Sequence, residues 1–469
     1  MFLKFCKRLT AAAALLLALC LLAGCAAEVA APETSVVKSA EGTWTMGYGS
    51  EKILLPAGSA GPLYIAGFDN GVTISGVRDD PRASAVWMDT DGQGVLLISV
   101  DCIALASETM NAIREKLAGF CAETGCVSVN VTATHTHAGI DTLGLWGPEG
   151  VDGKNASYME NLILAAVQAA ESAYADRCAG TLYYSTAATH MLEYDSRDPY
   201  VFDPHLYQLR FAPDDSAQNG IRLLTFGAHA EALRDDNTLL SRDYPGVLCD
   251  SVKAQSGDDA LFLPGALGGQ IVTRDLCTGL FDAEENLVRT GELLAQAVME
   301  IEPAAETEVA PVLSAARVEF DAPLDNTLYM YYKLLGVLES ELHDGESATG
   351  YTVRSELSAL SLGDVTMLLL PGEIFPELVT GEGLEGVDPE SLSSIAASFG
   401  REKLIVAGLS NDELGYIVPP SDFVLNDTLP YIETVDDASE DHYEETNSIG
   451  PDAAAVIAGA VRDALELLK

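Results

Sequence analysis

The sequence predicts an α/β protein with mixed, partly parallel sheets and flanking helices. Strand-like, helix-like and strand-like segments follow one another at residues 94–100, 107–120 and 127–137, which is the pattern of a βαβ unit in a partly parallel sheet. Several short apolar runs end directly in polar residues, as strands of open α/β sheets do where they bind ligands. The 469 residues are 48% hydrophobic, which is enough for one large elaborated domain or two domains.

The first residues predict a targeting signal. Lys4, Lys7 and Arg8 precede an apolar run over residues 9–22, which is too short and wrongly flanked for a standard membrane-spanning helix. The run ends in Leu22-Ala23-Gly24-Cys25, which resembles a bacterial lipobox, where signal cleavage leaves the cysteine as the lipidated first residue. The alternative is a plain secretory signal with an incidental cysteine.

This signal divides the chain into three parts. We expect a lipoprotein signal peptide at residues 1–24, a lipidated Cys25 with a flexible tether over residues 25–43, and one folded domain over residues 44–469. The mature protein is then expected to be extracytoplasmic and anchored to the cell membrane by the lipid on Cys25.

Charge and cysteine usage exclude some classes of partner and site. The formal net charge is −45 at pH 7, and a chain this acidic repels nucleic acid and anionic lipid surfaces. The cysteines after Cys25 are scattered without C-x-x-C pairs, so no thiolate zinc site is implied. Cys121 and Cys126 could form a disulfide across a short turn or could be free thiols.

The folded region is predicted to begin with a hairpin and a helix. Residues 85–88 and 94–100 are strand-like, and Thr90-Asp91-Gly92 between them is a turn signal. Ser107 can cap the helix that follows, because apolar residues then recur at helical spacing up to Phe120.

The next strand carries the most informative pattern of the chain. Apolar residues alternate with polar ones from Val127 to Ala133, and the apolar face continues into His135 and His137. If the strand persists to His137, both rings leave its carboxyl end on one face, about 6–7 Å apart. That spacing suits one metal ligand beside one hydrogen-bond donor. The alternative is a pair of histidines in an exposed turn.

The remainder of the chain alternates between helix-like and strand-like segments. Helices are predicted at residues 157–176, 283–300 and 452–468. Strands at residues 206–211 and 221–226 are expected to pair, because a polar turn separates them. Two more short buried strands are predicted at residues 365–370 and 404–408.

Polar residues end four of these strands. They are His135 with His137, His229, Glu373, and the turn from Asn411 to Tyr416. A carboxylate placed directly after an apolar run is costly unless a partner compensates its charge. A metal ion is such a partner, because two imidazoles, a carboxylate and a further oxygen, with a position left for water, form the ligand set of a catalytic zinc.

Five short motifs resemble the catalytic domain of the neutral (non-lysosomal) ceramidase family. They are Thr134-His135-Thr136-His137; His229 followed by Ser241-Arg242-Asp243-Tyr244-Pro245-Gly246; Leu370-Pro371-Gly372-Glu373; Gly408-Leu409-Ser410-Asn411 with Gly415-Tyr416; and His442-Tyr443-Glu444 with Gly450-Pro451. Each motif alone is weak, but their common order makes the resemblance specific, and it covers most of the mature chain. Because the sequence ends after the helix predicted at residues 452–468, we expect the family's C-terminal immunoglobulin-like domain to be missing.

The resemblance implies roles for individual residues. One zinc ion, Zn²⁺, is expected to be held by His135, His229, Glu373 and Tyr416. The scissile amide carbonyl is expected to be surrounded by His137, Tyr443 and an arginine, for which Arg197 is the best match. The alternatives are a surface ion pair for Arg197 and a half-buried packing role for Tyr443. We also expect Asp243 to orient one of the histidines as an outer partner.

One position departs from the family pattern. The family has a Gly-Asp-Val-Ser-Pro-Asn segment whose serine has been assigned a catalytic part, and residues 265–274 correspond to it here. Ile271 stands at the serine position and Gly269 at the aspartate position. Since Ile271 has no hydroxyl, covalent catalysis through that residue is not expected, and the substrate need not be ceramide.

These observations predict a zinc-dependent amidohydrolase. It would cleave an acyl amide, such as an N-acylsphingosine, with zinc-activated water. Arg197, Tyr443 and protonated His137 would stabilise the oxyanion, and His137 could protonate the leaving amine. The alternatives are a zinc esterase or another amidase acting on a non-ceramide substrate, and a catalytically degenerate surface lipoprotein that only binds a ligand.

Overall fold

The structure is a computed structural model that describes residues 34–38, 42–56, 61–189, 192–274, 279–435 and 442–469. The expected signal peptide and Cys25 lie outside these residues. Thr34–Lys38 forms strand β1, which pairs antiparallel with β15 (Leu313–Leu324). The prediction of a flexible tether over residues 25–43 is therefore wrong for this segment. Within the described ranges, no helix is both long enough and apolar enough to cross a membrane.

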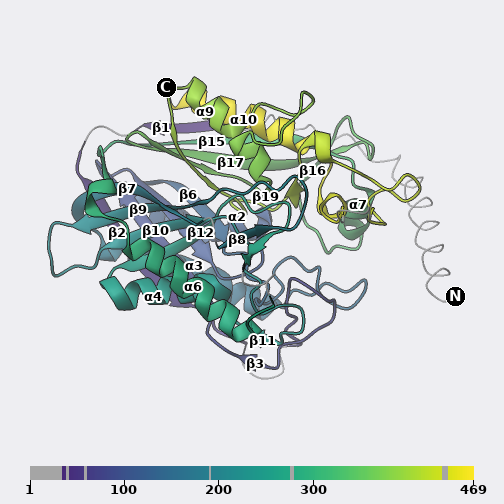
Figure 1. Ribbon diagram of the computed structural model, residues 1–469, viewed down its shortest axis with the longest axis horizontal. Helices are drawn as coiled ribbons and strands as arrows, with labels where there is room; N and C mark the ends of the chain where they lie inside the picture. The colour runs from purple at the N-terminus through teal and green to yellow at the C-terminus, as the bar shows by residue number, and fades with distance from the viewer. Residues whose placement is uncertain (1–33, 39–41, 57–60, 190–191, 275–278, 436–441) are drawn as a thin grey trace.

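Two large sheets lie face to face at the centre of the fold, and helices cover their outer sides (Figure 1). The six-stranded sheet has the order β1-β15-β17-β18-β20, with β16 paired to β17. Besides β1 and β15, it contains β16 (Leu342–Asp344), β17 (Tyr351–Leu362), β18 (Val365–Leu369) and β20 (Lys403–Ala407).

The nine-stranded sheet has the order β12-β10-β9-β7-β2-β4-β5-β6, with β14 paired to β7. Its strands are β2 (Trp44–Lys52), β4 (Arg82–Asp89), β5 (Gly94–Val100), β6 (Cys126–Ala133), β7 (Cys178–Ala188), β9 (His205–Pro213), β10 (Ile221–Phe226), β12 (Asp259–Pro264) and β14 (Thr307–Val309). In the described part of the chain, three two-stranded pairs complete the strands: β3 (Gly76–Val77) with β11 (Leu239–Leu240), β8 (Glu193–Asp195) with β13 (Ile271–Thr273), and β19 (Glu373–Ile374) with β21 (Tyr416–Ile417).

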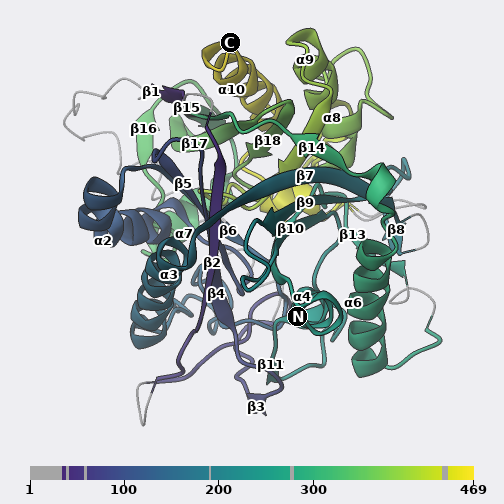
Figure 2. The same cartoon turned by 90° about the vertical axis from the view of Figure 1, so that its left-hand side faces the viewer.

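Apolar side chains fill the space between the layers. Leu97 and Leu209 of the larger sheet meet Leu360 and Met367 of the smaller sheet in one core. The outer face of the smaller sheet packs against α10 (Ala453–Leu467), with α8 (Pro376–Thr380) and α9 (Leu392–Ser398) beside it. Two helix pairs pack on the larger sheet: α2 (Ser107–Thr124) with α3 (Ala156–Asp176), and α4 (Asp243–Ser256) with α6 (Ala283–Met299). Figure 2 shows these two pairs well apart from each other.

The predicted mixed α/β architecture is confirmed. Strands β4 and β5 form the expected hairpin, and β5 and β6 are parallel with α2 between them. Strands β9 and β10 pair antiparallel, and β18 and β20 pair parallel. The three later predicted helices are α3, α6 and α10. Among the residues that the structure describes, the other helices with assigned bounds are α7 (Thr327–Leu334) and the short turns Pro303–Ala305, Pro420–Asp422 and Glu444–Asn447.

The start of α2 differs from the prediction. Its N-cap residue is Ala106, and no side-chain cap hydrogen bond forms there. Instead, the Ser107 N–H donates to Asp412 Oδ1 at 2.8 Å, across 305 residues of sequence. The Asp412 carboxylate thus accepts a hydrogen bond from the first turn of α2, as a local N-cap side chain would. The same hydrogen bond ties the turn that precedes Tyr416 to the start of α2. Cys121 and Cys126 are free thiols in this structure.

Candidate metal centre

Two parallel pairs of short segments bring the four polar strand ends together. Residues 135–137 run parallel to residues 229–231, through the Thr136–Ala230 bridge and a 2.9 Å hydrogen bond from the His137 N–H to the Ala230 carbonyl. Paired residues of parallel strands share a face, so His135 and His137 lie beside His229 and Glu231. In the second pair, β19 places Glu373 opposite Tyr416 of β21.

The strand that carries the first histidines ends earlier than predicted. Strand β6 stops at Ala133, and His135 has a left-handed backbone φ of 62°. The two ring centroids lie 4.8 Å apart, so the predicted strand continuation to His137, with rings about 6–7 Å apart, is wrong. A left-handed non-glycine residue costs about 1–3 kcal/mol and is typical of functional sites. Here it lets both Nε2 atoms approach to 3.3 Å.

Four potential metal ligands converge. Glu373 Oε2 lies 3.3 Å from His135 Nε2 and 3.0 Å from His229 Nε2. Tyr416 Oη lies 3.5 Å from His229 Nε2. These are the four ligands that the sequence resemblance implies, and the structure places all of them together. The three histidines also form a group whose ligand atoms lie within 4.8 Å of one another, so His137 is within reach of the same point.

The outer nitrogens of two histidines are held by backbone carbonyls. His135 Nδ1 donates to the Ile103 carbonyl at 2.8 Å, and His229 Nδ1 donates to the Ile271 carbonyl at 2.8 Å. Because a carbonyl only accepts, each Nδ1 carries hydrogen and each Nε2 faces the centre. This is the usual outer arrangement around metal-bound histidines.

The donor set fits a single metal ion. Zinc binds histidine nitrogen and carboxylate oxygen at about 2.0–2.2 Å in tetrahedral geometry, which separates the ligand atoms by about 3.3–3.6 Å. The separations described above, 3.0–3.5 Å, are close to that value. A metal ion among these imidazole, carboxylate and phenol groups would compensate the cost of burying the Glu373 carboxylate.

The pKa shifts at the centre show that the Glu373 carboxylate is stabilised by positive charge on its neighbours. Burial alone would raise the pKa of Glu373, but the neighbouring His135 and His229 outweigh it and hold the pKa below its usual range. Burial lowers the pKa of His229, yet contact with Glu373 raises it to about 9 overall. Burial, followed by the charges of His135 and His229, holds the pKa of His137 well below its usual value. His137 is therefore neutral at physiological pH.

A cavity of about 290 Å³ borders these donors, and His135, His137, Glu373 and Tyr416 are among its lining residues. Much of its wall is apolar or aromatic, contributed by Phe68, Leu145, Trp146, Tyr329, Tyr332, Leu338, Leu414 and Tyr443. Such a wall suits an acyl or other apolar group next to the polar centre. The Tyr443 side chain is 42% exposed, and its ring lies 6.2 Å from that of Tyr416, so it stands at the border of the cavity.

Arg197 does not reach this cavity. Its side chain is buried, and Nε donates to Asp422 Oδ2 at 3.0 Å. Nη1 donates to Glu444 and Glu445, and Nη2 donates to Glu445 and to the Asp422 carbonyl, at 2.7–3.2 Å. These contacts engage the five donors of the guanidinium. The predicted contact with a substrate carbonyl is wrong in this structure, and so is the surface ion pair, since Arg197 is an interior anchor for the segment that carries Tyr443.

Two other predicted features have different roles from those expected. The Asp243 carboxylate accepts hydrogen bonds from the N–H groups of Ala232, Leu233 and Tyr244, and it forms no hydrogen bond with a histidine among the described residues. The expectation that it orients a histidine is wrong, although it does shape the loop after His229. The Ile271 side chain is buried in the core beside Phe226 and Tyr244, so position 271 contributes only its carbonyl to the centre.

Two carboxylates at the centre were not predicted. Glu231 Oε2 lies 3.8 Å from His137 Nδ1. Glu413 lines the cavity, its Oε2 is buried without a hydrogen-bond partner in the described structure, and burial raises its pKa well above the usual value. In the sequence, Glu231 follows His229 by two residues, as His137 follows His135. This repeated spacing is the sequence signal that could have predicted Glu231 at the centre.

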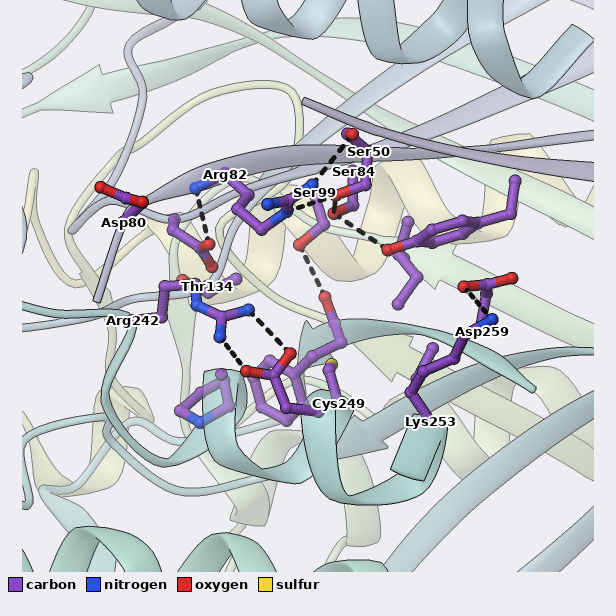
Figure 3. A pocket seen from close by; sticks show the side chains of 18 of the residues that line it. Ser50, Asp80, Arg82, Ser84, Ser99, Thr134, Arg242, Cys249, Lys253 and Asp259 are labelled. Atoms are coloured by element: carbon purple, nitrogen blue, oxygen red, sulfur yellow. Dashed lines mark hydrogen bonds and ion pairs between the residues drawn. The ribbon is translucent and has the colours of Figure 1, made fainter. Parts of the chain in front are cut away.

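A second pocket, of about 370 Å³, lies between strands of the larger sheet and α4 (Figure 3). Its charged lining residues are Lys52, Asp80, Arg82, Asp101, Arg242, Asp250, Lys253 and Asp259. The charges pair with one another: Lys52 with Asp80, Arg242 with Asp250, and Lys253 with Asp259. Six of the eight charged residues of this pocket are therefore paired within it, and it holds no histidine.

The chain is thus a two-sheet α/β protein with a candidate metal centre, whose histidine, glutamate and tyrosine donors lie at strand ends. No protein-family model and no curated protein matches the chain. Among solved structures, neutral ceramidase from Pseudomonas aeruginosa is similar, with a TM-score of 0.70 and 15% identity over 92% of this chain and 75% of that chain. A ceramidase complexed with C2 is similar, with a TM-score of 0.69 and 16% identity over 91% and 75%. The predicted neutral-ceramidase-like fold is confirmed.

A buried carboxyl outside the metal centre gives a prediction for stability against pH. Burial raises the pKa of Glu193 to about 8, and its Oε2 has no hydrogen-bond partner in the described structure. The folded state therefore binds this proton more tightly than the unfolded state, so stability falls as the pH rises from about 4.5 to 8. Glu193→Gln is expected to flatten this slope and to raise the thermal midpoint at pH 8–9. Thermal unfolding of the wild type and of Glu193→Gln tests this prediction. An equal fall of the thermal midpoint with pH in the two proteins would contradict it.

Proposed function

We propose that this chain is a metal-dependent hydrolase of acyl amides, with zinc as the metal. The observation that carries the proposal is the convergence of His135, His229, Glu373 and Tyr416 beside a largely apolar cavity. The ceramidase-like fold supports an amide as the scissile group.

Each residue of the centre has a defined task in this proposal. His135, His229, Glu373 and Tyr416 would hold the ion. Bound zinc supplies Lewis-acid chemistry, in that it lowers the pKa of a water and polarises a carbonyl. His137 is neutral, and its Nε2 faces the centre, so it can accept a proton from the attacking water and pass it to the leaving amine.

The cavity wall supplies binding and further stabilisation. The Tyr443 hydroxyl would donate to the oxyanion that forms on the carbonyl, and one such donor is typically worth about 2.7–4 kcal/mol. The leucine and aromatic side chains would bind the acyl group and exclude water from the reacting atoms. With Arg197 engaged in the interior, Tyr443 and His137 are the remaining predicted groups that line the cavity.

The test is hydrolysis of a fluorescent short-chain ceramide by the full chain in detergent. We expect release of the fatty acid, loss of that activity after treatment with a chelator, and its recovery on addition of zinc, because the donors alone do not activate water. Turnover that is unaffected by complete removal of metal would overturn the proposal.

A second candidate is a zinc esterase or an amidase for a smaller, non-ceramide substrate. The cavity of about 290 Å³ is just below the range for ligand pockets, about 300–1,000 Å³, which favours a short acyl group. A matched pair of amide and ester substrates with the same short acyl group discriminates between them. Faster chelator-sensitive cleavage of short acyl substrates than of ceramide would support this candidate.

A further inference from the structure

Glu231 lies at the metal centre, and the proposed function assigns it no role. Its carboxylate faces His137, with Oε2 3.8 Å from Nδ1, and the side chains of His137 and Glu231 are only 11% and 15% exposed. His137 Nδ1 is buried and makes no hydrogen bond of normal geometry in the described structure, and the Gly67 backbone is a second acceptor near the ring, which raises the pKa of His137. Glu231 follows His229 by two residues, and the parallel bridge between Thr136 and Ala230 sets it beside His137.

The three histidines of the centre differ in what holds their outer nitrogen. His135 and His229 each donate Nδ1–H to a backbone carbonyl at 2.8 Å, which keeps their Nε2 lone pairs inward. A neutral imidazole carries one N–H, and the acceptor beside it decides which nitrogen bears it. For His137, Glu231 is a nearby carboxylate acceptor at the outer nitrogen, and carboxylates form stronger hydrogen bonds than carbonyls.

We propose that Glu231 is a positioning residue, whose carboxylate accepts a hydrogen bond from His137 Nδ1–H and keeps the His137 Nε2 lone pair facing His135 Nε2. The inference rests on the proposed function, in which that Nε2 accepts a proton. The separation of 3.8 Å exceeds a hydrogen bond, but such contacts are often long in ligand-free structures and shorten in the reacting complex.

The backbone of Gly67 fixes the plane of the same ring. A Cβ at Gly67 would lie 2.7 Å from His137 Cβ, Cγ and Nδ1, and the φ of Gly67 is +117°. Glycine is therefore required at this position for the ring to occupy its place. Since the backbone packs against the ring and Glu231 approaches Nδ1, the glycine sets the ring position and the carboxylate sets the tautomer.

The first test is nitrogen NMR of the zinc-loaded full chain, labelled with ¹⁵N-histidine. We expect His137 to be in the Nδ1–H tautomer in the wild type and in Glu231→Gln, whose amide oxygen can still accept. In Glu231→Ala, the His137 signals should shift to the Nε2–H tautomer or to a mixture. Asp235→Asn is the matched control, because Asp235 is an exposed acidic residue in the same loop. An unchanged Nδ1–H tautomer in Glu231→Ala would overturn the inference.

The second test is kinetic and uses the fluorescent short-chain ceramide. Loss of an outer partner of this type typically costs about 10–100-fold, so we expect Glu231→Ala to lower kcat by that factor with little change in KM. Because Glu231 acts through His137, adding Glu231→Ala to His137→Ala should cost nothing more. A further loss in that double variant would contradict the inference. Absence of zinc-dependent turnover in the wild type would instead contradict the proposed function, and the tautomer measurement would still decide the role of Glu231.

Discussion

Replacing Glu373 with Gln is expected to remove bound zinc and at least about 100-fold of the hydrolytic rate. Glu373 Oε2 lies 3.0–3.3 Å from two imidazole nitrogens, and it is the only carboxylate among the four predicted ligands. The amide of glutamine is neutral, so it cannot balance the charge of the ion. Loss of a mere outer partner costs about 10–100-fold, and loss of a ligand should cost no less. Metal analysis after dialysis and kcat/KM on the fluorescent amide measure both effects.

Glu377→Gln is the matched control for this variant. Glu377 is also a buried glutamate, four residues further on in α8. Burial raises its pKa to about 8, so the carboxyl is mostly protonated at pH 7 and the glutamine resembles it. We expect this control to retain both zinc and activity. If Glu373→Gln retained them as well, the assignment of Glu373 as a ligand would be wrong.

Replacing Arg197 with Met is expected to lower the free energy of unfolding by about 3–5 kcal/mol, the usual cost of breaking a buried ion pair. The variant leaves Glu444 and Glu445, both fully buried, without their cation. Burial would raise the pKa of Glu445, but Arg197 outweighs it and holds the pKa below its usual value. The stabilisation through Glu445 is therefore present above about pH 4.5 and is lost as the pH falls further. Burial raises the pKa of Glu444 to about 7 despite Arg197, so the pair with Glu444 contributes only at higher pH. Urea unfolding of the wild type and of Arg197→Met at pH 7.5 and at pH 4 measures the loss in the free energy of unfolding, which should be larger at pH 7.5.

Arg462→Met provides the comparison. Arg462 also pairs with a glutamate, Glu390, but the two side chains are 43% and 42% exposed. Exposed pairs of this kind contribute at most about 1 kcal/mol, so this variant should unfold almost like the wild type. If Arg197→Met proved equally stable and yet inactive, Arg197 would be a catalytic group, as the sequence resemblance implied, and the interior anchor would be wrong.

Regular elements were predictable because their signals are local. Alternation of apolar residues, a turn signal and helical spacing identified the β4–β5 hairpin, the β5–α2–β6 unit and helix α3. The cap of α2 was not predictable, because the carboxylate that accepts its first N–H is Asp412, 305 residues away. Strand β1 was missed for a related reason: the five-residue segment Thr34–Lys38 is too short for a clear pattern, and it pairs with β15 only because the edge of the sheet lies beside it.

The sequence predicted which residues form the candidate metal centre, but it did not predict their relative positions. A histidine or carboxylate that directly follows a buried strand is visible in the sequence, and this rule placed His135, His229 and Glu373. The left-handed turn at His135 depends on the parallel neighbour at residues 229–231 and has no local signature. Arg197 was misassigned because the sequence around it shows an arginine without showing which carboxylates surround it.

The most direct test of the account is the zinc content of the purified full chain, measured together with the rate of amide hydrolysis as zinc is removed and returned. We predict one bound ion per chain, with hydrolysis that falls and recovers in proportion to occupancy. A chain that holds no stoichiometric metal, or that hydrolyses the amide equally well without it, would contradict the claim that His135, His229, Glu373 and Tyr416 form a catalytic metal centre.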